Sequence, residues 1–239
     1  MHIKKKILAI IGARSGSKEF KNKNIKKLGD KPLMGWIIKA AIKSNLINRT
    51  IVSTDSKRYA KIARSFKAET PILRPKKLST DSSRELDFIK HMLKWLKKNE
   101  NYKPDIIVRL LATCPFQKTK DIDSVIKIIL KKKYDSAVII SKSRQHPEKA
   151  LKIIGKKNKK LVSYIGNKGT HVGYNNNRQA YIPAYFRANV IACEANIIQK
   201  YNSLTGSKVG YIIIPQKRSI DIDSKEDFEY AKYLIDHFN

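Results

Sequence analysis

Short apolar segments alternate with stretches of helical periodicity along most of the chain, and this alternation limits the folds open to it. Residues 7–11 form an entirely apolar run, which is typical of a strand buried on both faces of a parallel sheet. Residues 122–130 instead place apolar side chains at helical spacing, as in a helix that packs on a sheet. The alternation predicts an α/β fold, a three-layer αβα arrangement with a mostly parallel sheet between two layers of helices.

The same patterns place the individual elements. Strands are expected at residues 7–11, 50–54, 71–73, 105–111, 136–140, 185–192 and 211–214. Helices are expected after Pro32, over 56–66, after caps at Asp81 and Asp121, and at the C-terminus. Ser224 and Asp227 have the spacing of a capping box, with Asp in place of the usual Glu, so the last helix should begin there.

The pattern breaks at residues 142–183. This stretch is polar and rich in Lys and Asn, with several glycines that act as turn signals. It is too long for a plain loop in a compact domain. We therefore expect residues 1–141 and 184–239 to form one α/β domain, and residues 142–183 to form an inserted, hairpin-like subdomain.

The formal net charge of +31 suggests a polyanionic partner, but the type of basic residue argues against a specific one. Of the 51 basic residues, 11 are Arg and 40 are Lys. Arg is the residue favoured for fork-like recognition of phosphates and bases, and no nucleic-acid-binding motif is present. We interpret the lysines as solvated side chains on helix faces and expect no specific nucleic-acid partner. The alternative is a functional surface that attracts polyanions.

Membrane and disulfide signals are weak. No apolar run approaches the roughly 20 residues that a membrane helix needs. The apolar run near the N-terminus is short and ends in Arg and Lys rather than in a small-residue cleavage site. Cys114 and Cys193 form neither a CxxC pair nor a disulfide framework. These observations predict a soluble, cytoplasmic protein without a membrane partner.

A small, polar and basic loop directly follows the first expected strand. It reads GARSGSK over residues 12–18 and continues to Lys23 and Asn24. Ligands bind at the carboxyl ends of parallel strands, and Gly and Ser let backbone amides approach phosphate oxygens while Arg and Lys supply charge. The loop fits neither GxxxxGK[ST] nor GxGxxG. It predicts phosphate binding, and the alternative is an ordinary basic surface loop.

Two carboxylates precede the last expected helix. Asp221 and Asp223 are two positions apart, and in an extended segment such side chains point to the same side. Converging carboxylates suit a hard cation such as Mg²⁺. The alternative, that one of them caps the helix, is less favoured because Ser224 already fits that role. Other cations, Arg74 before Pro75 and the pair Lys149 and Arg178, are weak signals in isolation.

Taken together and in order, these segments resemble the acylneuraminate cytidylyltransferases, which make CMP-activated sialic and related acids. The resemblance runs nearly from end to end of the chain. The matching segments are GARSGSKEFKNKNI (12–25), VSTD (52–55), LRP (73–75), LSTD (78–81), QHPEKAL (145–151), NRQAYIPAYFRAN (177–189) and SIDID (219–223). The resemblance implies a Rossmann-like nucleotidyltransferase fold. The implied reaction transfers CMP from CTP to the anomeric hydroxyl of a sialic-acid-like (nonulosonate) sugar acid and releases pyrophosphate.

The resemblance also implies roles for particular residues. Those that would bind the nucleotide are Arg14, Ser17, Lys18, Lys23, Asn24 and Arg74, and those that would be catalytic are Arg14, Lys23 and Asp223. Asp221 and Asp223 would hold Mg²⁺, and Asp223 would also accept the proton of the attacking hydroxyl. Lys149 and Arg178 would face the sugar acid, one of them from the partner subunit of a homodimer formed through the inserted segment.

The chain departs from the family mainly on the sugar side. Leu111 stands where the family has a sugar-contacting Gln, and Cys193 stands where it has a Tyr. We expect both to line the sugar pocket and the sugar to differ from N-acetylneuraminate. Glu85 stands where the family has a Ser near the base, so the identity of the nucleotide base stays open. Alternatives are a keto-deoxy-octulosonate-type sugar, another nucleotide, an inactive homologue, or a basic nucleic-acid-binding protein.

Overall fold

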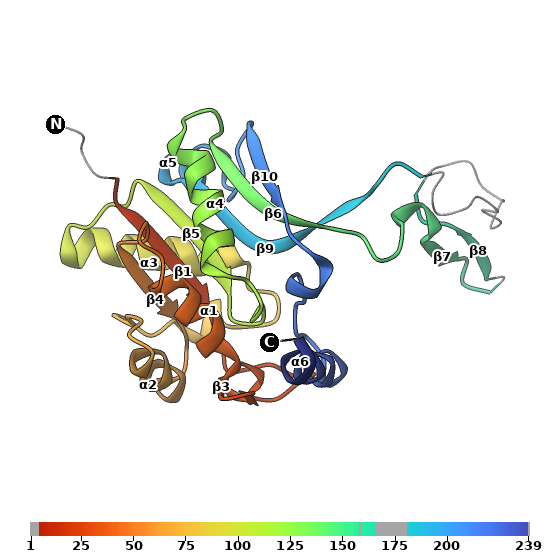
Figure 1. Ribbon diagram of the computed structural model, residues 1–239, viewed down its shortest axis with the longest axis horizontal. Coiled ribbons are helices and arrows are strands. Elements are labelled where there is room, and N and C mark those ends of the chain that lie inside the picture. Colours follow the sequence, from red (N-terminus) through yellow and green to blue (C-terminus); the bar gives the residue numbers. More distant parts are fainter. Residues whose placement is uncertain (1–4, 158, 166–180, 239) are drawn as a thin grey trace.

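A computed structural model of the chain describes residues 5–157, 159–165 and 181–238. It is a three-layer αβα structure with a long arm on one side (Figure 1). The central sheet has six strands in the order β10-β6-β9-β5-β1-β4. Its strands are β1 (Ile7–Gly12), β4 (Arg49–Ser53), β5 (Ile106–Leu111), β6 (Ser136–Lys142), β9 (Tyr185–Glu194) and β10 (Val209–Ile213). The expected α/β class is confirmed.

The sheet is mostly parallel, as expected, with one exception. β1 pairs in parallel with β4 and with β5, and β6 pairs in parallel with β10. β9 lies antiparallel between β5 and β6. The described residues between β6 and β9 form the arm and contain no α-helix of the kind that connects parallel strands, in keeping with the antiparallel direction of β9.

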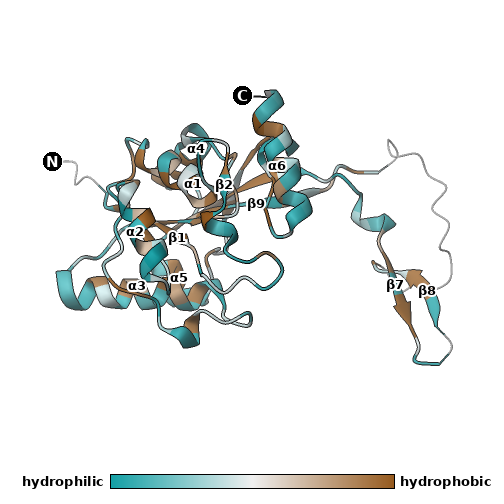
Figure 2. Cartoon of the chain, turned by 90° about the horizontal axis from the view of Figure 1, so that it is seen from below, coloured by the Kyte–Doolittle hydropathy of each residue, from teal (hydrophilic) through white to brown (hydrophobic). Residues whose placement is uncertain are grey.

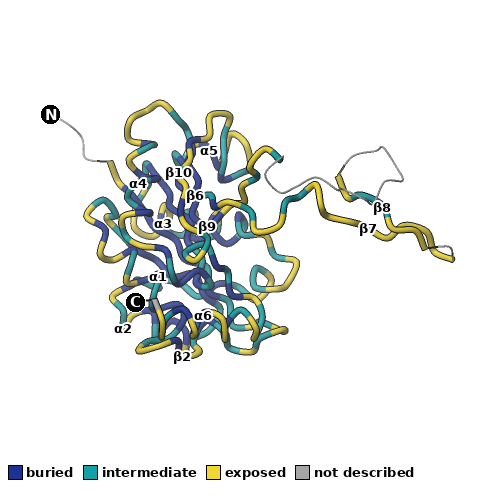
Figure 3. The backbone as a smooth tube through the Cα atoms, turned by 45° about the vertical axis from the view of Figure 1, so that its right-hand side comes forward, coloured by how far each residue is buried: buried dark blue, intermediate teal, exposed yellow. Residues whose placement is uncertain are grey.

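Helices cover both faces of the sheet. The helices are α1 (Leu33–Ile42), α2 (Lys57–Ser65), α3 (Glu85–Glu100), α4 (Thr119–Leu130), α5 (Ala195–Tyr201) and α6 (Lys225–Phe238). Apolar side chains of α1, α2 and α4 pack in one core, and those of α3 and α5 pack in a second. The buried residues lie within the body of the molecule, whereas the backbone of the arm is coloured mostly as exposed (Figure 3).

A third, smaller core joins α6 to a short hairpin after the first loop. The hairpin is β2 (Lys27–Leu28) paired with β3 (Lys31–Pro32). Leu28, Leu33 and Phe228 are buried together there. Short 3₁₀ helices complete the structure: η1 (Lys23–Ile25), η2 (Lys76–Leu78), η3 (Pro147–Lys149) and η5 (Gln216–Arg218).

The N-terminal residues of the helices can be compared with the capping residues expected from the sequence. The capping box is confirmed, because Ser224 Oγ accepts a hydrogen bond from Asp227 N at 3.1 Å and Asp227 Oδ2 accepts one from Ser224 N at 2.9 Å. Asp121 is not the cap residue of α4. It occupies the first turn and accepts a hydrogen bond from the amide of Lys118, the cap residue, at 3.0 Å. Asp81 is not a cap either, because α3 begins at Glu85.

The strand expected at residues 71–73 is absent. This part of the chain contributes a single parallel bridge, between Ile51 and Glu69. Pro71 and Pro75 flank the segment, and proline cannot donate a backbone hydrogen bond to a ladder.

The arm carries a separate two-stranded sheet. β7 (Leu151–Ile154) pairs in antiparallel fashion with β8 (Lys160–Ser163). In Figures 1 and 2 this hairpin lies far from the main sheet, and the hydropathy colouring of Figure 2 shows brown, apolar residues on it. Ile153 is 67% exposed and Leu161 is 48% exposed. No described helix is both long and apolar enough to cross a membrane.

Candidate active site

The first loop, residues 13–24, leaves the carboxyl end of β1 and is held there by polar contacts. β1 lies between β4 and β5, and the helices that lead to these two strands pack on opposite faces of the sheet, which opens a crevice at this edge. Ser15 N and Oγ each donate a hydrogen bond to the Asp55 carboxylate at 2.8 Å. Asn24 Nδ2 donates to the Arg14 carbonyl at 3.1 Å. The VSTD segment was the only sequence signal for Asp55.

A pocket opens beside this loop, and four parts of the chain meet in it: the loop, residues 74–88, the end of β5, and the segment before α6. Its lining residues are Gly12, Arg14, Ser17, Lys23, Asn24, Arg74, Leu78, Thr80, Asp81, Ser83, Glu85, Phe88, Leu111, Thr113 and Asp223. Lys18 lines an adjoining hollow, which also includes Arg14 and Lys23. The residues expected to bind a nucleotide therefore lie around one connected site.

Arg74 forms part of the buried wall of this pocket. It is 6% exposed, its Nε donates to Ser53 Oγ at 3.1 Å, and its Nη2 donates to the Ser53 carbonyl at 2.5 Å. The guanidinium carbon lies 4.1 Å from the centroid of the Phe88 ring. Burial lowers the pKa of Arg74 to about 10, so it remains a cation at neutral pH. A Cβ at Gly12 would lie 2.8 Å from the Phe88 ring, so a larger residue there would displace this ring.

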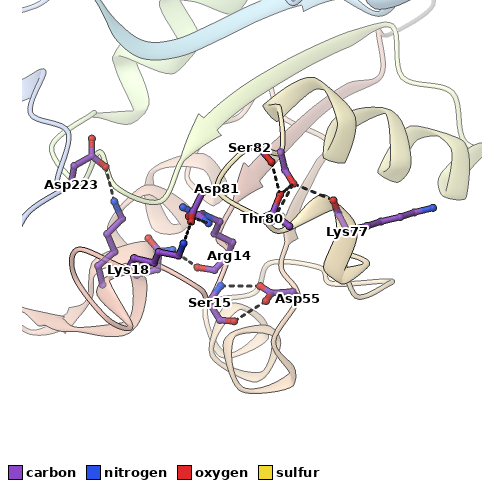
Figure 4. A network of polar contacts seen from close by, with 12 residues as sticks. Arg14, Ser15, Lys18, Asp55, Lys77, Thr80, Asp81, Ser82 and Asp223 are labelled. Carbon is purple, nitrogen blue, oxygen red and sulfur yellow. Dashed lines mark hydrogen bonds and ion pairs between the residues drawn. The ribbon is translucent and has the colours of Figure 1, made fainter. Parts of the chain in front are cut away.

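Asp81 lies among the cations of the first loop (Figure 4). Its Oδ1 is 2.6 Å from Arg14 Nη1, and its Oδ2 is 2.9 Å from Lys18 Nζ. Hydrogen bonds from Lys18 and then Arg14 lower the pKa of Asp81. The expected role of Asp81 as a helix cap is therefore wrong. Its carboxylate instead pairs with the positively charged side chains of Arg14 and Lys18.

The two carboxylates before α6 face different surroundings. Asp223 is exposed and accepts a hydrogen bond from Lys23 Nζ at 2.6 Å at the mouth of the pocket (Figure 4). Asp221 is half-buried, and its Oδ2 accepts a hydrogen bond from Asn189 Nδ2 at 2.5 Å. The amide of Ile222, between them, donates to the Thr113 carbonyl at 2.9 Å and fixes the segment against the end of β5.

One oxygen of Asp221 is left without a partner. Oδ1 is buried and accepts no hydrogen bond of normal geometry from the described residues, although Thr113 and Cys114 lie close enough to lower its pKa. Burial outweighs them and, with the nearby Asp223 charge, raises the pKa of Asp221. An unsatisfied carboxylate oxygen beside a second carboxylate fits a hard cation. The described residues contain no group of three or more acidic, His or Cys side chains placed for a metal, so phosphate oxygens or water would complete such a site.

A second hollow adjoins Asp221. Its lining residues are Ser141, Lys142, Ser143, Arg144, Phe186, Arg187, Gln216, Ser219, Ile220, Asp221, Asp227 and Tyr230. The Arg144 guanidinium carbon lies 5.3 Å from the centroid of the Tyr230 ring. The sequence reasoning did not single out Arg144 or Arg187. The signal for Arg187 was its place in the FRAN segment, two residues before Asn189.

Two described residues expected on the sugar side, Cys193 and Lys149, do not line the pocket in this chain. Cys193 is 1% exposed in the core beneath β9, so the expectation that it lines a pocket is wrong: its side chain faces α3 and α5 rather than the sheet edge. Lys149 lies on the arm, with its Nζ 5.6 Å from the centroid of the Tyr181 ring. Arg178 lies outside the described residues. Leu111 does line the pocket.

This arrangement, a basic loop after β1 and paired carboxylates around a pocket at the carboxyl edge of an α/β sheet, is typical of enzymes that bind nucleoside phosphates. The comparison with known proteins narrows the class. A family model described as cytidylyltransferase matches residues 8–236, and the chain belongs to that family.

Relatives with assigned names support the same placement. The chain is 32% identical over 229 residues to an N-acylneuraminate cytidylyltransferase of Escherichia coli, covering 95% of this chain and 51% of that protein. It is 28% identical to a CMP-N,N'-diacetyllegionaminic acid synthase of Campylobacter jejuni, covering 96% of this chain and 94% of that protein. The chain thus spans about half of the first relative and nearly all of the second.

Solved structures share the fold at low sequence identity. One is CMP:2-keto-3-deoxy-manno-octonic acid synthetase complexed with CTP, with a TM-score of 0.70, 14% identity, and coverage of 97% of this chain and 98% of that one. Another is 4-diphosphocytidyl-2C-methyl-D-erythritol synthase from Anaerococcus prevotii, with a TM-score of 0.65, 16% identity, and coverage of 98% and 99%.

Proposed function

We propose that this protein transfers CMP from CTP to the anomeric hydroxyl of a nonulosonate sugar acid and releases pyrophosphate. The observation that carries the proposal is the single pocket in which first-loop cations, Arg74 and Asp223 meet at the carboxyl end of β1. Membership of the cytidylyltransferase family supports the nucleotide and the reaction class. The names of the Escherichia coli and Campylobacter jejuni relatives support a nonulosonate acceptor.

The cationic end of the pocket suits a triphosphate. Arg14 and Lys18 are both close to Asp81, and Lys23 is close to Asp223, so in the free protein each cation has a carboxylate partner. We assign these cations, with Ser17 and Asn24, to the phosphate oxygens of CTP, which would replace Asp81 as the anionic partner. Phosphoryl transfer depends mainly on such positioning and charge neutralisation.

The carboxylate pair fits Mg²⁺. Asp221 offers a buried, unpartnered oxygen, and Asp223 is an exposed carboxylate two residues on. We assign both as the protein ligands of the metal. When bound, Mg²⁺ would supply positive charge to the phosphate oxygens.

The reaction requires a residue of this chain to accept the proton of the attacking hydroxyl. The anomeric oxygen forms a bond to the α-phosphorus, the bond from that phosphorus to the bridging oxygen breaks, and pyrophosphate takes that electron pair. The hydroxyl proton must leave the attacking oxygen. We assign Asp223 as its acceptor, because this carboxylate is exposed at the mouth of the pocket, where an acceptor sugar can approach.

The hollow beside Asp221 is the proposed place of the sugar acid. Arg144 and Arg187 would face the anionic carboxylate of the sugar with charge-assisted hydrogen bonds. Leu111, at the end of β5, lines the nucleotide pocket rather than this hollow. It places an apolar side chain where the resemblance implies a sugar-contacting Gln, so we propose a sugar that differs from N-acetylneuraminate. A keto-deoxy-octulosonate-type acceptor remains the second candidate, since the fold is shared with a synthetase named for such an acid.

We further propose a homodimer built on the inserted segment, residues 142–183. The hairpin exposes apolar side chains, among them Ile153 and Leu161, that the other described residues leave open to solvent. Burial against a second copy would remove this surface from water. In that assembly the arm would carry Lys149 and Arg178 toward the partner's sugar hollow.

Pyrophosphate release tests the proposal. The full chain is incubated with Mg²⁺ and each of CTP, UTP, ATP and GTP, together with a panel of nonulosonates and a keto-deoxy-octulosonate. Release that requires both CTP and a nonulosonate supports the proposal. Release only with the octulosonate, or only with another nucleotide, supports those alternatives, and salt-sensitive binding of nucleic acid without any release supports the non-enzymatic one.

A further inference from the structure

Arg109 is a charged residue in the middle of a central strand. β5 lies between β1 and β9, and Arg109 pairs in register with Ile10 on one side and Ile191 on the other. Its side chain is 6% exposed, and burial lowers its pKa. A buried guanidinium is costly unless a partner compensates its charge, so the choice of partner is informative.

The partner of Arg109 is a carboxylate of the pocket. Arg109 Nε lies 3.3 Å from Glu85 Oε2, and Nη1 donates a hydrogen bond to the Asn189 carbonyl at 3.1 Å. Nε forms no hydrogen bond of normal geometry, so the contact with Glu85 is an ion pair. Glu85 itself is 43% exposed and lines the pocket. A carboxylate that only neutralised Arg109 could be fully buried beside it. The exposure of Glu85 to the pocket therefore points to a second role, as a contact for a ligand.

The lining of the pocket brings cations, carboxylates and an aromatic ring together. The first-loop cations Arg14 and Lys23 are the ones that we assign to the triphosphate. Residues 74–88 add the Phe88 ring, a cationic donor, Arg74, and, besides Asp81, a second carboxylate, Glu85. The contact with Arg109 is made by Glu85 Oε2, so the other oxygen of this partly exposed carboxylate is an acceptor that a ligand can reach. A flat heterocycle with both an acceptor and a donor on its edge complements these side chains.

We propose that Glu85, held in place by Arg109, accepts a hydrogen bond from the exocyclic amine of the base and thereby selects cytosine over uracil. The inference rests on the proposed function, namely that the pocket binds a pyrimidine nucleoside triphosphate. Cytosine has a donating amine at the position where uracil has a carbonyl oxygen. Against the Glu85 carboxylate, uracil would set two acceptors face to face. A donor such as Arg74 can satisfy the O2 that both bases share, so it does not discriminate between them.

The test is the equilibrium binding of CTP and of UTP to the full chain with Mg²⁺ and without sugar acid, measured by calorimetry. The wild-type protein should bind CTP about 100-fold more tightly than UTP, because a site built to accept from the amine rejects the analogue that lacks it. Glu85→Gln keeps the shape but can also donate to the uracil carbonyl, so the ratio should fall about tenfold or more. The matched control is Glu100→Gln, which breaks the 2.6 Å contact with Arg49 at the other end of α3 and should keep the wild-type ratio.

A second variant keeps the test decisive if Glu85→Gln folds poorly. The double variant Glu85→Gln with Arg109→Leu removes the buried charge together with its partner, and it should lose discrimination to the same extent. The inference is overturned if the wild-type protein binds CTP and UTP equally, or if a folded variant keeps a ratio within about threefold of the wild-type ratio, a change smaller than one hydrogen bond supplies. Wild-type protein that binds neither nucleotide would contradict the proposed function itself.

Discussion

Asp81 and Arg14 form an ion pair of 2.6 Å in the pocket that we assign to the triphosphate. Asp81 also lies 2.9 Å from Lys18, so one carboxylate holds two cations of the first loop. A bound triphosphate would have to compete with this carboxylate for the same cations. In the free protein, an acidic side chain of the chain itself thus occupies the two cations that we assign to the triphosphate.

Removing that competitor should strengthen nucleotide binding. Asp81→Asn leaves Arg14 and Lys18 without their anionic partner, so the affinity for CTP should rise a few-fold and depend more steeply on salt. Calorimetric titration at two ionic strengths measures both effects. The control is Asp87→Asn, which breaks the ion pair with Arg84 at the start of α3. Weaker CTP binding in Asp81→Asn would show that Asp81 holds the first loop in a conformation that binds CTP, rather than competing with CTP for Arg14 and Lys18.

The carboxylate pair should be essential for turnover. Asp221→Asn or Asp223→Asn should lower kcat/KM by at least about 100-fold, since a metal supplies several kcal/mol of charge stabilisation. Steady-state pyrophosphate release measures this loss, and EDTA should abolish release by the wild-type protein. Asp236→Asn, on the exposed part of α6, should leave the rate unchanged. Full turnover in EDTA would refute the metal assignment.

Asp221 should reduce the stability of the metal-free protein at neutral pH. Its pKa is raised in the folded state, so folding favours the protonated form. That stabilisation is present below the unfolded pKa and is lost as the pH rises through the folded pKa. Asp221→Asn should therefore melt at a higher temperature than wild type at pH 7 without metal. Mg²⁺ should raise the melting temperature of the wild-type protein but not of the variant, and equal metal effects on both would contradict the assignment.

Leu111 should influence the choice of sugar. It lines the pocket at the end of β5, and Leu111→Gln would restore the amide that the family has at this position. The variant should shift kcat/KM toward N-acetylneuraminate by about tenfold or more, the scale of one hydrogen bond. The measurement compares the wild-type protein and the variant across the sugar panel. A wild-type protein that already prefers N-acetylneuraminate, or an unchanged ranking in the variant, would contradict this interpretation.

The exposed hairpin should control assembly. Replacing Ile153 and Leu161 by Lys places charge on the apolar surface that we assign to the partner copy. Light scattering at micromolar concentration should give the mass of a dimer for the wild-type protein and a lower mass for the double variant. Lys156→Gln, in the turn of the same hairpin, should remain dimeric. A monomeric wild-type protein would rule out this assignment.

Local signals predicted the parts of the fold that depend on neighbours in sequence. The apolar run of β1 and the capping box at Ser224 and Asp227 are confirmed because each is decided within a few residues. The pocket residues of the first loop could be predicted for the same reason: they directly follow a strand, and the carboxyl ends of parallel strands meet at one edge.

The remaining differences between the sequence predictions and the structure arise from contacts between residues that are far apart in the sequence. The direction of β9 depends on where the chain re-enters the sheet, which no local pattern encodes. Cys193 was expected in a pocket because a family motif surrounds it. Because β9 runs antiparallel to β5, Cys193 instead pairs with Ile107 near the amino end of β5, away from the edge of the sheet where the pocket lies. Asp81 has the local signature of a cap, but partners from a loop more than sixty residues earlier decide its role. Glu85 and Arg109 likewise meet only in the folded chain.

The most direct test of the central claim is the identity of the product. The full chain is incubated with CTP, Mg²⁺ and each acid of the nonulosonate panel, and the mixture is analysed by mass spectrometry together with the amount of pyrophosphate formed. The account predicts a CMP-linked nonulosonate in amounts equal to the pyrophosphate released, and no product from Asp223→Asn. Absence of any CMP-sugar across the panel, in protein that is folded and binds CTP, would contradict it.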